Sequence, residues 1–374
     1  MLVALLAFAT YILGGATARA GPPPVVNEKA ADSLIEFFLN PRKGRGVLPP
    51  ALSVSIGRDG KLLFAKGYGE AHPGHKADAA TVYRIGSITK QFTAAAILRS
   101  IGKGARTESD AAPLTLETSA TAVLDNSSSW SVDDAPPITI RNLLSMTSNL
   151  PNFTHRPPRG LDPWGTVPAS ALRNALTRLS PSDRPGTFEY SNTSYFLLAE
   201  ILEAITIDGQ TRTYAEALRQ DVFEPFGLKS SGLPYQMPPR ETLAHPTYRR
   251  RPAFIERDWL KGSGDAASTV VDLFAWNVAL MRAHAANEAW AVAMLAEQAR
   301  VDVWTYYGMG WFITHKNGAD QFFHTGSVPG YTSLNMIVVD GDKSWTSVSI
   351  LTNSDGVAGL EDLGDELARL ATGN

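Results

Sequence analysis

The sequence has no cysteine among its 374 residues. It can therefore form no disulfide, use no thiolate as a nucleophile and hold no metal through thiolate ligands. It also lacks an excess of positive charge, because 34 Lys and Arg stand against 37 Asp and Glu and give a formal net charge of −3. A nucleic-acid-binding surface is usually basic, so we expect no nucleic-acid partner.

Three further signals are missing. There is no Gly-rich phosphate-binding loop, no Gly-x-Ser-x-Gly elbow around Ser87, and no apolar run of 18 or more residues beyond the N-terminal region. Hydrophobic residues at 44% and charged residues at 19% are typical of a globular chain. The length allows one large domain or two smaller ones.

The N-terminal region has the composition of an export signal. Residues 2–18 are apolar or small, and Ala18-Arg19-Ala20 fits the small-x-small cleavage pattern. We therefore expect a signal peptide over residues 1–20, a proline-containing linker over 21–27, and a periplasmic or secreted protein. The alternative is an uncleaved membrane anchor, because about 17 apolar residues is the lower limit for spanning a bilayer.

Strand patterns occur near both ends of the chain. Residues 52–57 and 61–68 flank Asp59-Gly60, which predicts a hairpin. Near the C-terminus we expect strands over 308–314, 321–324, 333–339 and 346–352. Helices are predicted over 28–39 and 360–370, and between the two strand regions over 116–124, 139–146, 169–179, 194–204, 214–223, 270–283 and 289–299.

These patterns predict an α+β fold with one antiparallel sheet. Helices from both ends of the chain would flank the sheet, and an all-helical subdomain of about residues 91–300 would be inserted between the sheet-forming ends. Residues 28–374 would form a single catalytic domain. The cleft between the sheet and the helical subdomain is then the expected place for a site.

The first candidate for chemistry is Ser87-Ile88-Thr89-Lys90, at the start of an apolar helical run. Three residues on a helix turn by about 300° and rise by about 4.5 Å, so Ser87 and Lys90 share a face. A serine hydroxyl needs a base to become a good nucleophile, and a lysine kept neutral by burial can be that base. The alternative is a solvated helix face.

Two later motifs add candidate groups. Tyr190-Ser191-Asn192 follows a Pro-Gly turn, so a phenolate at Tyr190 could take the Ser87 proton while Asn192 bonds Lys90 and a substrate amide. His324-Thr325-Gly326-Ser327 ends a predicted strand, where Gly326 would leave room for a ligand. The backbone N–H of Ser327 could form an oxyanion hole with that of Ser87. Taken singly, Tyr190 could be a packed aromatic and His324 a structural histidine.

The order S-x-x-K, Y-x-N and H-x-G resembles the penicillin-recognising serine hydrolases, which include the class C β-lactamases, the D-alanyl-D-alanine carboxypeptidases and related esterases. Segments 141–151, 223–228, 262–269 and 307–311 also look like that family, and the resemblance spans about residues 28–370. It implies the sheet-and-helix fold described above and a chemistry without a cofactor or metal.

The resemblance also implies roles for the site residues. Ser87 would be the acylated nucleophile, and Lys90 and Tyr190 would share the proton transfers. Asn192 would bind the amide of the acyl group. The third motif would line the substrate through His324, Thr325 and Gly326, and Ser327 would donate to the oxyanion.

One departure from the family bears on the substrate. Position 324 is His where most class C β-lactamases have Lys, which removes a fixed cation suited to a substrate carboxylate. We expect a D,D-carboxypeptidase-like hydrolase acting on peptidoglycan-derived peptides or small esters and amides. Esterase activity, β-lactamase activity and a catalytically silent penicillin-binding or sensor domain are the alternatives.

Two other features receive a structural interpretation. His72 and His75 could be taken for a metal-binding pair, but no third ligand is evident in the sequence. The run Arg249-Arg250-Arg251 is interpreted as a solvated loop that could attract anionic substrates.

Overall fold

The protein is described here by a computed structural model. It describes residues 26–40, 50–109, 111–124, 130, 136–162, 167, 169–237, 243–246, 259–316 and 318–372. The predicted signal peptide, most of the linker and Arg249–Arg251 lie outside these residues. Within them, no helix combines the length and hydropathy needed to cross a membrane.

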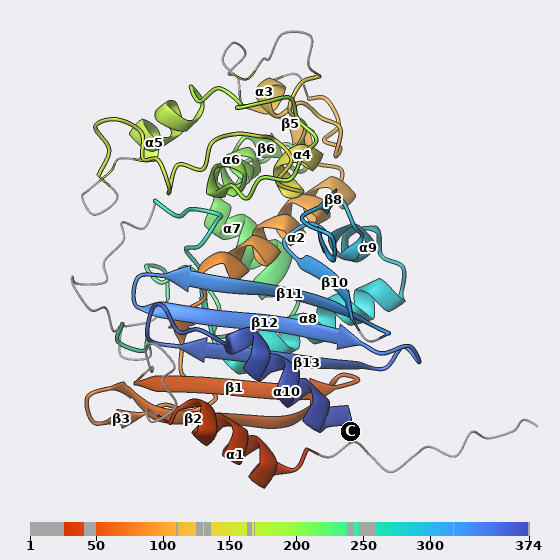
Figure 1. Cartoon of the computed structure of the whole chain (residues 1–374). Helices are drawn as coiled ribbons and strands as arrows, with labels where there is room; N and C mark the ends of the chain where they lie inside the picture. The colour runs from red at the N-terminus through yellow and green to blue at the C-terminus, as the bar shows by residue number, and fades with distance from the viewer. Residues whose placement is uncertain are drawn as a thin grey trace, which may run out of the picture.

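A nine-stranded antiparallel sheet forms the centre of the molecule, with strand order β3-β2-β1-β13-β12-β11-β10-β9-β8 (Figure 1). The N-terminal hairpin lies beside the last strand, so that Leu52 pairs with Thr352. The strands of this sheet are β1 (Ala51–Arg58), β2 (Lys61–His72), β3 (His75–Lys76), β8 (Ala299–Arg300), β9 (Thr305–Tyr307), β10 (Phe312–Lys316), β11 (Ala319–Val328), β12 (Tyr331–Val339) and β13 (Trp345–Thr352). The two ends of the chain therefore share one sheet, as the sequence predicts.

Two terminal helices cover one face of the sheet. They are α1 (Glu28–Phe38) and α10 (Leu360–Thr372), which pack on each other and on β1, β12 and β13 (Figure 1). Asn27 caps α1 by accepting a hydrogen bond from the Ala30 backbone N–H at 3.2 Å. The side chains buried beneath these helices form an aliphatic core that includes Ile35 and Leu367.

The other face of the sheet carries the helical subdomain. Its elements include η2 (Gly86–Ile88), α2 (Thr89–Gly102), α3 (Ala120–Val123), α4 (Ile140–Leu144), α5 (Ala169–Leu176), α6 (Asn192–Glu203), α7 (Tyr214–Leu218), η3 (Arg219–Phe223), α8 (Val270–Ala285) and α9 (Ala289–Leu295). Helix α2 is buried along most of its length, and α6, α7 and α9 pack around it. The small side chains of Ala94, Ala95 and Ala96 allow this close packing.

Two short ladders tie the subdomain together. Strand β4 (Tyr83–Arg84) pairs with β7 (Ala267–Ser268), and β5 (Arg106–Thr107) pairs with β6 (Ile205–Thr206). The β4–β7 ladder brings the segment before Ser87 next to the segment before α8. The α+β prediction of an antiparallel sheet, terminal helices and an inserted helical subdomain is confirmed.

Several predicted elements have different bounds, and three of them bear on the site or differ most. The strand expected over 308–314 is a turn followed by β10, because Gly310 has φ +86 and a Cβ there would lie 3.0 Å from the Lys90 carbonyl oxygen. The helix expected over 194–204 begins at Asn192, and the helix expected over 116–124 is reduced to α3.

Candidate active site

Ser87 lies in the short η2 turn that leads into α2. The Lys90 Nζ atom is 3.1 Å from Ser87 Oγ, so the three-residue spacing brings the two groups into contact. Ser87 is partly exposed while Lys90 is fully buried. The turn therefore presents a hydroxyl to solvent and keeps the amine behind it.

Strand β11 runs directly beside this turn because two glycines leave space for it. Gly86 has φ +50, and a Cβ on it would lie 2.7 Å from the Ser327 backbone nitrogen. A Cβ on Gly326 would lie 2.0 Å from the Ile85 carbonyl oxygen. The backbone of Ser327 is thus held against the Ser87 turn, which is the arrangement that a two-donor oxyanion hole needs.

Two further hydrogen bonds hold the Lys90 amine beside Ser87. Its Nζ donates to Asn192 Oδ1 at 2.7 Å and to the Ser263 carbonyl oxygen at 2.7 Å. With Ser87 Oγ as the third partner, an ammonium finds an acceptor for each of its three N–H groups, and a neutral amine can use its lone pair toward Ser87. The site therefore accommodates Lys90 both before and after it takes a proton.

The pKa of Lys90 agrees with this geometry. Burial lowers the pKa of the amine well below its usual value, and the charge of Asp265 opposes the shift. This direction favours the neutral amine, which is the form that can take the Ser87 proton.

Tyr190 closes the other side of the nucleophile. Its hydroxyl hydrogen-bonds with Ser87, and its ring centroid lies 4.9 Å from Lys90 Nζ. Burial raises the pKa of Tyr190 above its usual value. The sequence suggested a phenolate here, whereas this shift favours a neutral phenol that passes protons and leaves the role of base to Lys90.

Asn192 is the first residue of α6 and its amide is already used in both directions. Oδ1 accepts from Lys90, and Nδ2 donates to Thr154 Oγ1 at 2.9 Å. The backbone N–H of Asn192 donates to Asn152 Oδ1 at 3.3 Å. Asn192 therefore fixes Lys90 from the side of the helical subdomain.

His324 lies on β11 and is only 1% exposed. Its Nδ1 is 2.6 Å from the Thr325 carbonyl oxygen, so this nitrogen carries the hydrogen, and Nε2 is buried without a hydrogen-bond partner. Burial is the main cause that lowers the pKa of His324 to about 3. The imidazole is thus neutral at physiological pH.

An aromatic group surrounds His324. The ring centroid of Phe312 lies 5.2 Å from that of His324, and those of Tyr190 and Tyr307 both lie 6.1 Å away. Along the rest of the motif, Thr325 is partly exposed, Gly326 is buried and Ser327 is exposed. Along β11, Thr325 and Ser327 therefore reach solvent, whereas His324 and Gly326 lie inside the protein.

Three contributors escaped the sequence motifs. Gly86 and the Ser263 carbonyl are backbone features, and Phe312 carries no local signal. The segment that contains Ser263 was noted only for its likeness to the family. A backbone acceptor cannot be read from residue type, so only the fold reveals it.

The fold places His245 beside the pair formed by His72 and His75. The rings of His72 and His75 lie 3.9 Å apart, and that of His245 lies 4.9 Å from His72. Nevertheless, among the described residues no group of three His, Cys, Asp or Glu side chains is arranged to hold a metal.

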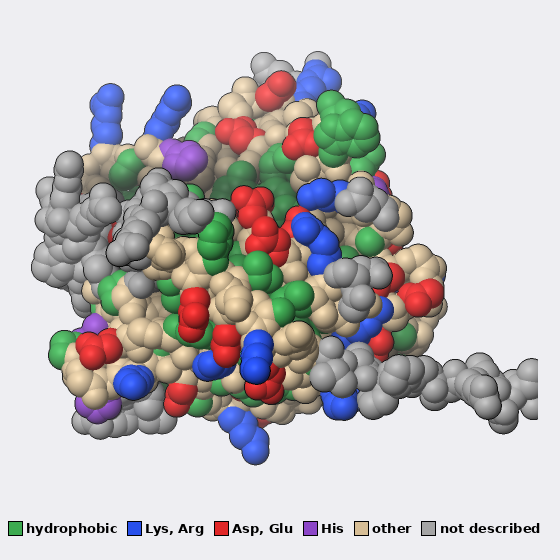
Figure 2. Space-filling model, turned by 60° about the horizontal axis from the view of Figure 1, so that its bottom comes forward, with side chains coloured by type: hydrophobic (Ala, Val, Ile, Leu, Met, Phe, Trp, Pro, Cys, Tyr) green, Lys and Arg blue, Asp and Glu red, His purple; other side chains and the backbone are tan. Residues whose placement is uncertain are grey.

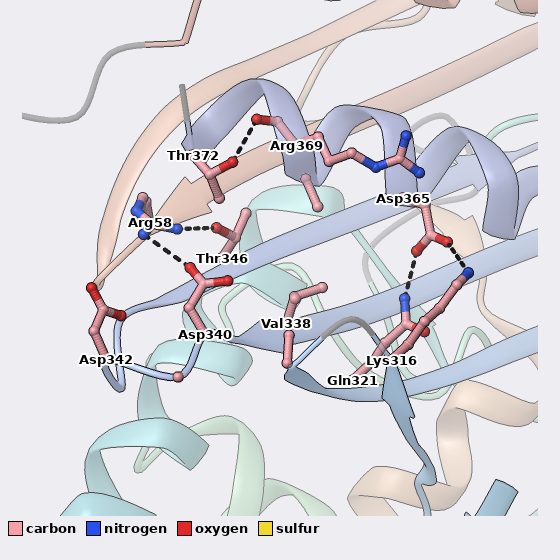
Figure 3. A pocket seen from close by; sticks show the side chains of 13 residues that line it. Arg58, Lys316, Gln321, Val338, Asp340, Asp342, Thr346, Asp365, Arg369 and Thr372 are labelled. Carbon is pink, nitrogen blue, oxygen red and sulfur yellow. Dashed lines mark hydrogen bonds and ion pairs between the residues drawn. The ribbon is translucent and has the colours of Figure 1, made fainter. Parts of the chain in front are cut away.

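A hollow among the described residues lies on the face of the sheet that α10 covers. It measures about 620 Å³ and is lined by α10, the turn after β12 and the start of β11 (Figure 3). Four of its charged side chains form two ion pairs: Arg58 with Asp340 at 3.0 Å and Lys316 with Asp365 at 3.1 Å. Acidic and basic side chains are likewise interspersed on the face that Figure 2 shows. The residues that line this hollow include no serine beside a lysine like the pair Ser87 and Lys90.

Comparison with known proteins agrees with the fold and the motifs. A family model described as Beta-lactamase matches residues 48–372. Penicillin-binding protein 4* of Bacillus subtilis is 23% identical over 329 residues, which cover 78% of this chain and 66% of the relative. A D-aminopeptidase of Brucella anthropi is 27% identical over 208 residues, which cover 54% of this chain and 36% of the relative. The chain thus spans only part of these curated relatives.

Solved structures share the fold over most of the chain. The octameric penicillin-binding protein homologue from Pyrococcus abyssi has a TM-score of 0.72 at 22% identity and covers 93% of this chain and 78% of that one. The D-amino acid amidase from Ochrobactrum anthropi SV3, solved with D-phenylalanine, has a TM-score of 0.71 at 19% identity and covers 92% and 99%.

Proposed function

The chain belongs to the beta-lactamase family of serine hydrolases, and from this we propose that it cleaves D-alanyl peptides or small amides and esters through an acyl-enzyme on Ser87. One observation carries the proposal most directly. Lys90 Nζ lies 3.1 Å from Ser87 Oγ and is held there by hydrogen bonds to Asn192 Oδ1 and the Ser263 carbonyl oxygen, both at 2.7 Å. A buried neutral amine in contact with a serine hydroxyl is the arrangement of an activated nucleophile.

The first half-reaction follows from these contacts. Lys90 takes the proton as Ser87 Oγ bonds to the acyl carbon, and the carbonyl oxygen becomes an oxyanion that the N–H groups of Ser87 and Ser327 stabilise. Tyr190, which hydrogen-bonds with Ser87 and whose ring lies 4.9 Å from Lys90 Nζ, relays the proton to the leaving amine or alcohol as that bond breaks. Water then attacks the ester by the same route in reverse and releases the acid.

The relatives support an acyl donor or amide built from D-amino acids. A D-aminopeptidase and a D-amino acid amidase are among the similar proteins. Because the chain covers only part of its curated relatives, their substrates enter here as a proposal. Esterase and β-lactamase activities use the same Ser87 chemistry and are tested beside the peptidase reaction.

The neutral state of His324 refines the choice of leaving group. A buried imidazole with no charge offers nothing to pair with a free carboxylate. We therefore expect an acyl-D-alanyl-D-alaninamide to be cleaved faster than the matching peptide with a free C-terminal carboxylate. His324→Lys restores a cation and should reduce the preference for the amide.

The experiment is a substrate panel with wild type and Ser87→Ala. It contains the matched amide and carboxylate peptides, a p-nitrophenyl ester and a chromogenic cephalosporin, together with labelling by a fluorescent penicillin and a fluorophosphonate. Turnover or labelling that disappears in Ser87→Ala supports the proposal. Absence of Ser87-dependent labelling by both reagents would overturn it and favour a silent binding or sensor domain.

Export remains part of the proposal. The apolar segment before residue 21 motivates it. Mass spectrometry of the mature N-terminus would support export by a start at or near residue 21. A start at Met1 in a membrane fraction would favour the anchored alternative.

A further inference from the structure

Asp265 is a buried carboxyl group that the reaction described above does not use. It is 6% exposed, and its Oδ1 atom is buried without a hydrogen-bond partner. An ionisable group in such a place is costly unless a nearby charge stabilises it. Its position therefore calls for a reason beyond packing.

The segment that carries Asp265 is bound along the first turns of α2. Lys90 Nζ donates to the Ser263 carbonyl at 2.7 Å, and the Ala266 backbone N–H donates to Thr89 Oγ1 at 3.1 Å. Thr93 Oγ1 donates to the Gly262 carbonyl at 2.8 Å. These bonds fix the backbone on both sides of Asp265 against the helical turn that carries the catalytic amine.

Few other charged groups act on Asp265. Lys261 is paired with Glu200 at 2.6 Å and with Glu203 at 2.7 Å. Arg84 also acts on Asp265, and Tyr214 hydrogen-bonds with it.

On the other side of the amine, Lys90 faces the neutral rings of Tyr190, Tyr195 and His324. Of the groups whose charge acts on Lys90, Asp265 is the one that favours the ammonium form.

We propose that Asp265 is a positioning residue for the acyl-transfer reaction and that its carboxylate stabilises the ammonium formed on Lys90 when Ser87 gives up its proton. In this step the Ser87 O–H bond breaks, the oxygen bonds to the acyl carbon, and the proton resides on Lys90 Nζ. Asp265 exchanges no proton and lowers the energy of the charged intermediate through its field. The inference rests on the proposed role of Ser87 and Lys90.

The electrostatic consequence has a definite sign. Burial raises the pKa of Asp265 to about 7, so its charge develops within the working pH range. Without that charge, burial alone acts on Lys90 and its pKa falls further. The amine of an uncharged variant is then free at lower pH, and it is also a weaker base.

The test measures the rate constant for fluorophosphonate labelling of Ser87 as a function of pH in wild type and Asp265→Asn. We expect the acidic limb to move by about one pH unit to lower pH, and the plateau rate to fall about tenfold because a weaker base removes the proton less well. Asp272→Asn is the matched control. Asp272 is a buried carboxyl that accepts from the Ser230 N–H at 2.7 Å and Ser231 Oγ at 2.8 Å, and its loss should reduce stability without moving the limb.

An unchanged acidic limb in folded Asp265→Asn would overturn the proposal and leave Asp265 a structural residue. If that variant does not fold, Asp265→Ser carries the same prediction, and Asp265→Glu should return the limb toward its wild-type position. Dependence of the labelling on Ser87 reports on the proposed function, whereas the position of the limb reports on Asp265. Failure of one is thereby distinguishable from failure of the other.

Discussion

The two faces of the central sheet are both buried but differ in chemistry. Along β1, Leu52, Val54 and Ile56 join the aliphatic core beneath α1 and α10, whereas Ser53 and Ser55 point to the helical subdomain. Ser55 Oγ donates to the Val270 carbonyl at 2.9 Å. Alternation of apolar and polar residues usually indicates a strand with one wet face, but here the polar face is covered as well.

The face toward the helical subdomain adds a side-chain network to its apolar contacts, which include Ile337 and Leu351. Asn335 on β12 donates to Gln91 at 3.0 Å, exchanges hydrogen bonds with Asn277 on α8 at 2.8 and 2.9 Å, and accepts from Ser349 at 2.8 Å. Gln91 directly follows Lys90, so the network fixes the turn that carries Ser87 and Lys90 to the sheet. The directional hydrogen bonds of this network define the positions of its side chains at some cost in stability. The aliphatic core on the other face contributes stability and directs no reactive group.

The largest test of this contrast is Lys90→Met on the polar side. Methionine fills a similar volume but cannot accept the Ser87 proton, so we expect kcat/KM to fall by about 10³-fold. The free energy of unfolding should fall by at most about 2 kcal/mol, because two freed carbonyl acceptors are offset by relief of the buried amine. Steady-state kinetics and urea unfolding measure the two effects. Near-wild-type turnover would contradict the assignment of Lys90 as the base.

Leu367→Ala tests the opposite face. Leu367 is fully buried on α10, and removing its side chain should lower the free energy of unfolding by about 2–5 kcal/mol. Because no reactive group is attached to this core, kcat/KM well below the melting temperature should stay within about twofold of wild type. Leu370→Ala is the matched control. Leu370 lies on the same helix but is only partly buried, so this substitution should lower the free energy of unfolding by less. A large loss of activity in folded Leu367→Ala would remove the distinction between the faces.

The contrast also explains what the sequence could and could not predict. Short-range signals were sufficient for β1, β2, α1 and α10, because period-two and period-3.6 patterns are local. The contact between Ser87 and Lys90 was likewise accessible, since three residues of helix determine it. The three motifs identified the candidate site residues.

Long-range geometry was not accessible in the same way. Residues 308–314 read as a strand, yet Gly310 turns the chain there to approach the Lys90 backbone. Asn192 begins α6 two residues before the helix start predicted at residue 194. The protonation states of Tyr190 and His324 depend on burial by residues far away in the chain, which no local pattern contains.

A smaller effect is expected from pH. His324 has a folded pKa of about 3, below its ordinary value of 6.5, so the unfolded chain binds the proton first. Its contribution to stability is present above about pH 6.5 and is lost as the pH falls toward 3. The difference in unfolding free energy between wild type and His324→Gln should therefore shrink over this window.

His315 provides a control of opposite sign. Hydrogen bonds to Asp320 and Glu297 raise its pKa, so the stability it contributes is present at low pH and is lost as the pH rises through its folded value. His315→Gln should therefore diverge from wild type at low pH, where His324→Gln converges. Parallel pH curves for the two variants would refute the neutral assignment of His324.

The smallest effect is expected in the hollow shown in Figure 3, on the face of the sheet that α10 covers. Lys316 is 62% exposed, and its partner Asp365 also accepts from Gln321 Nε2 at 2.6 Å. Lys316→Ala should thus change the free energy of unfolding by only about 0–1 kcal/mol, less at high salt, with no change in kcat/KM. Arg58→Ala in the same hollow should cost more, about 1–3 kcal/mol, because it removes a mostly buried ion pair with Asp340 and the hydrogen bond that Arg58 donates to the Thr346 hydroxyl. Equal losses of unfolding free energy for the two variants would mean that solvent exposure does not determine the strength of these ion pairs. Any loss of turnover would show that this side of the sheet also directs the reaction.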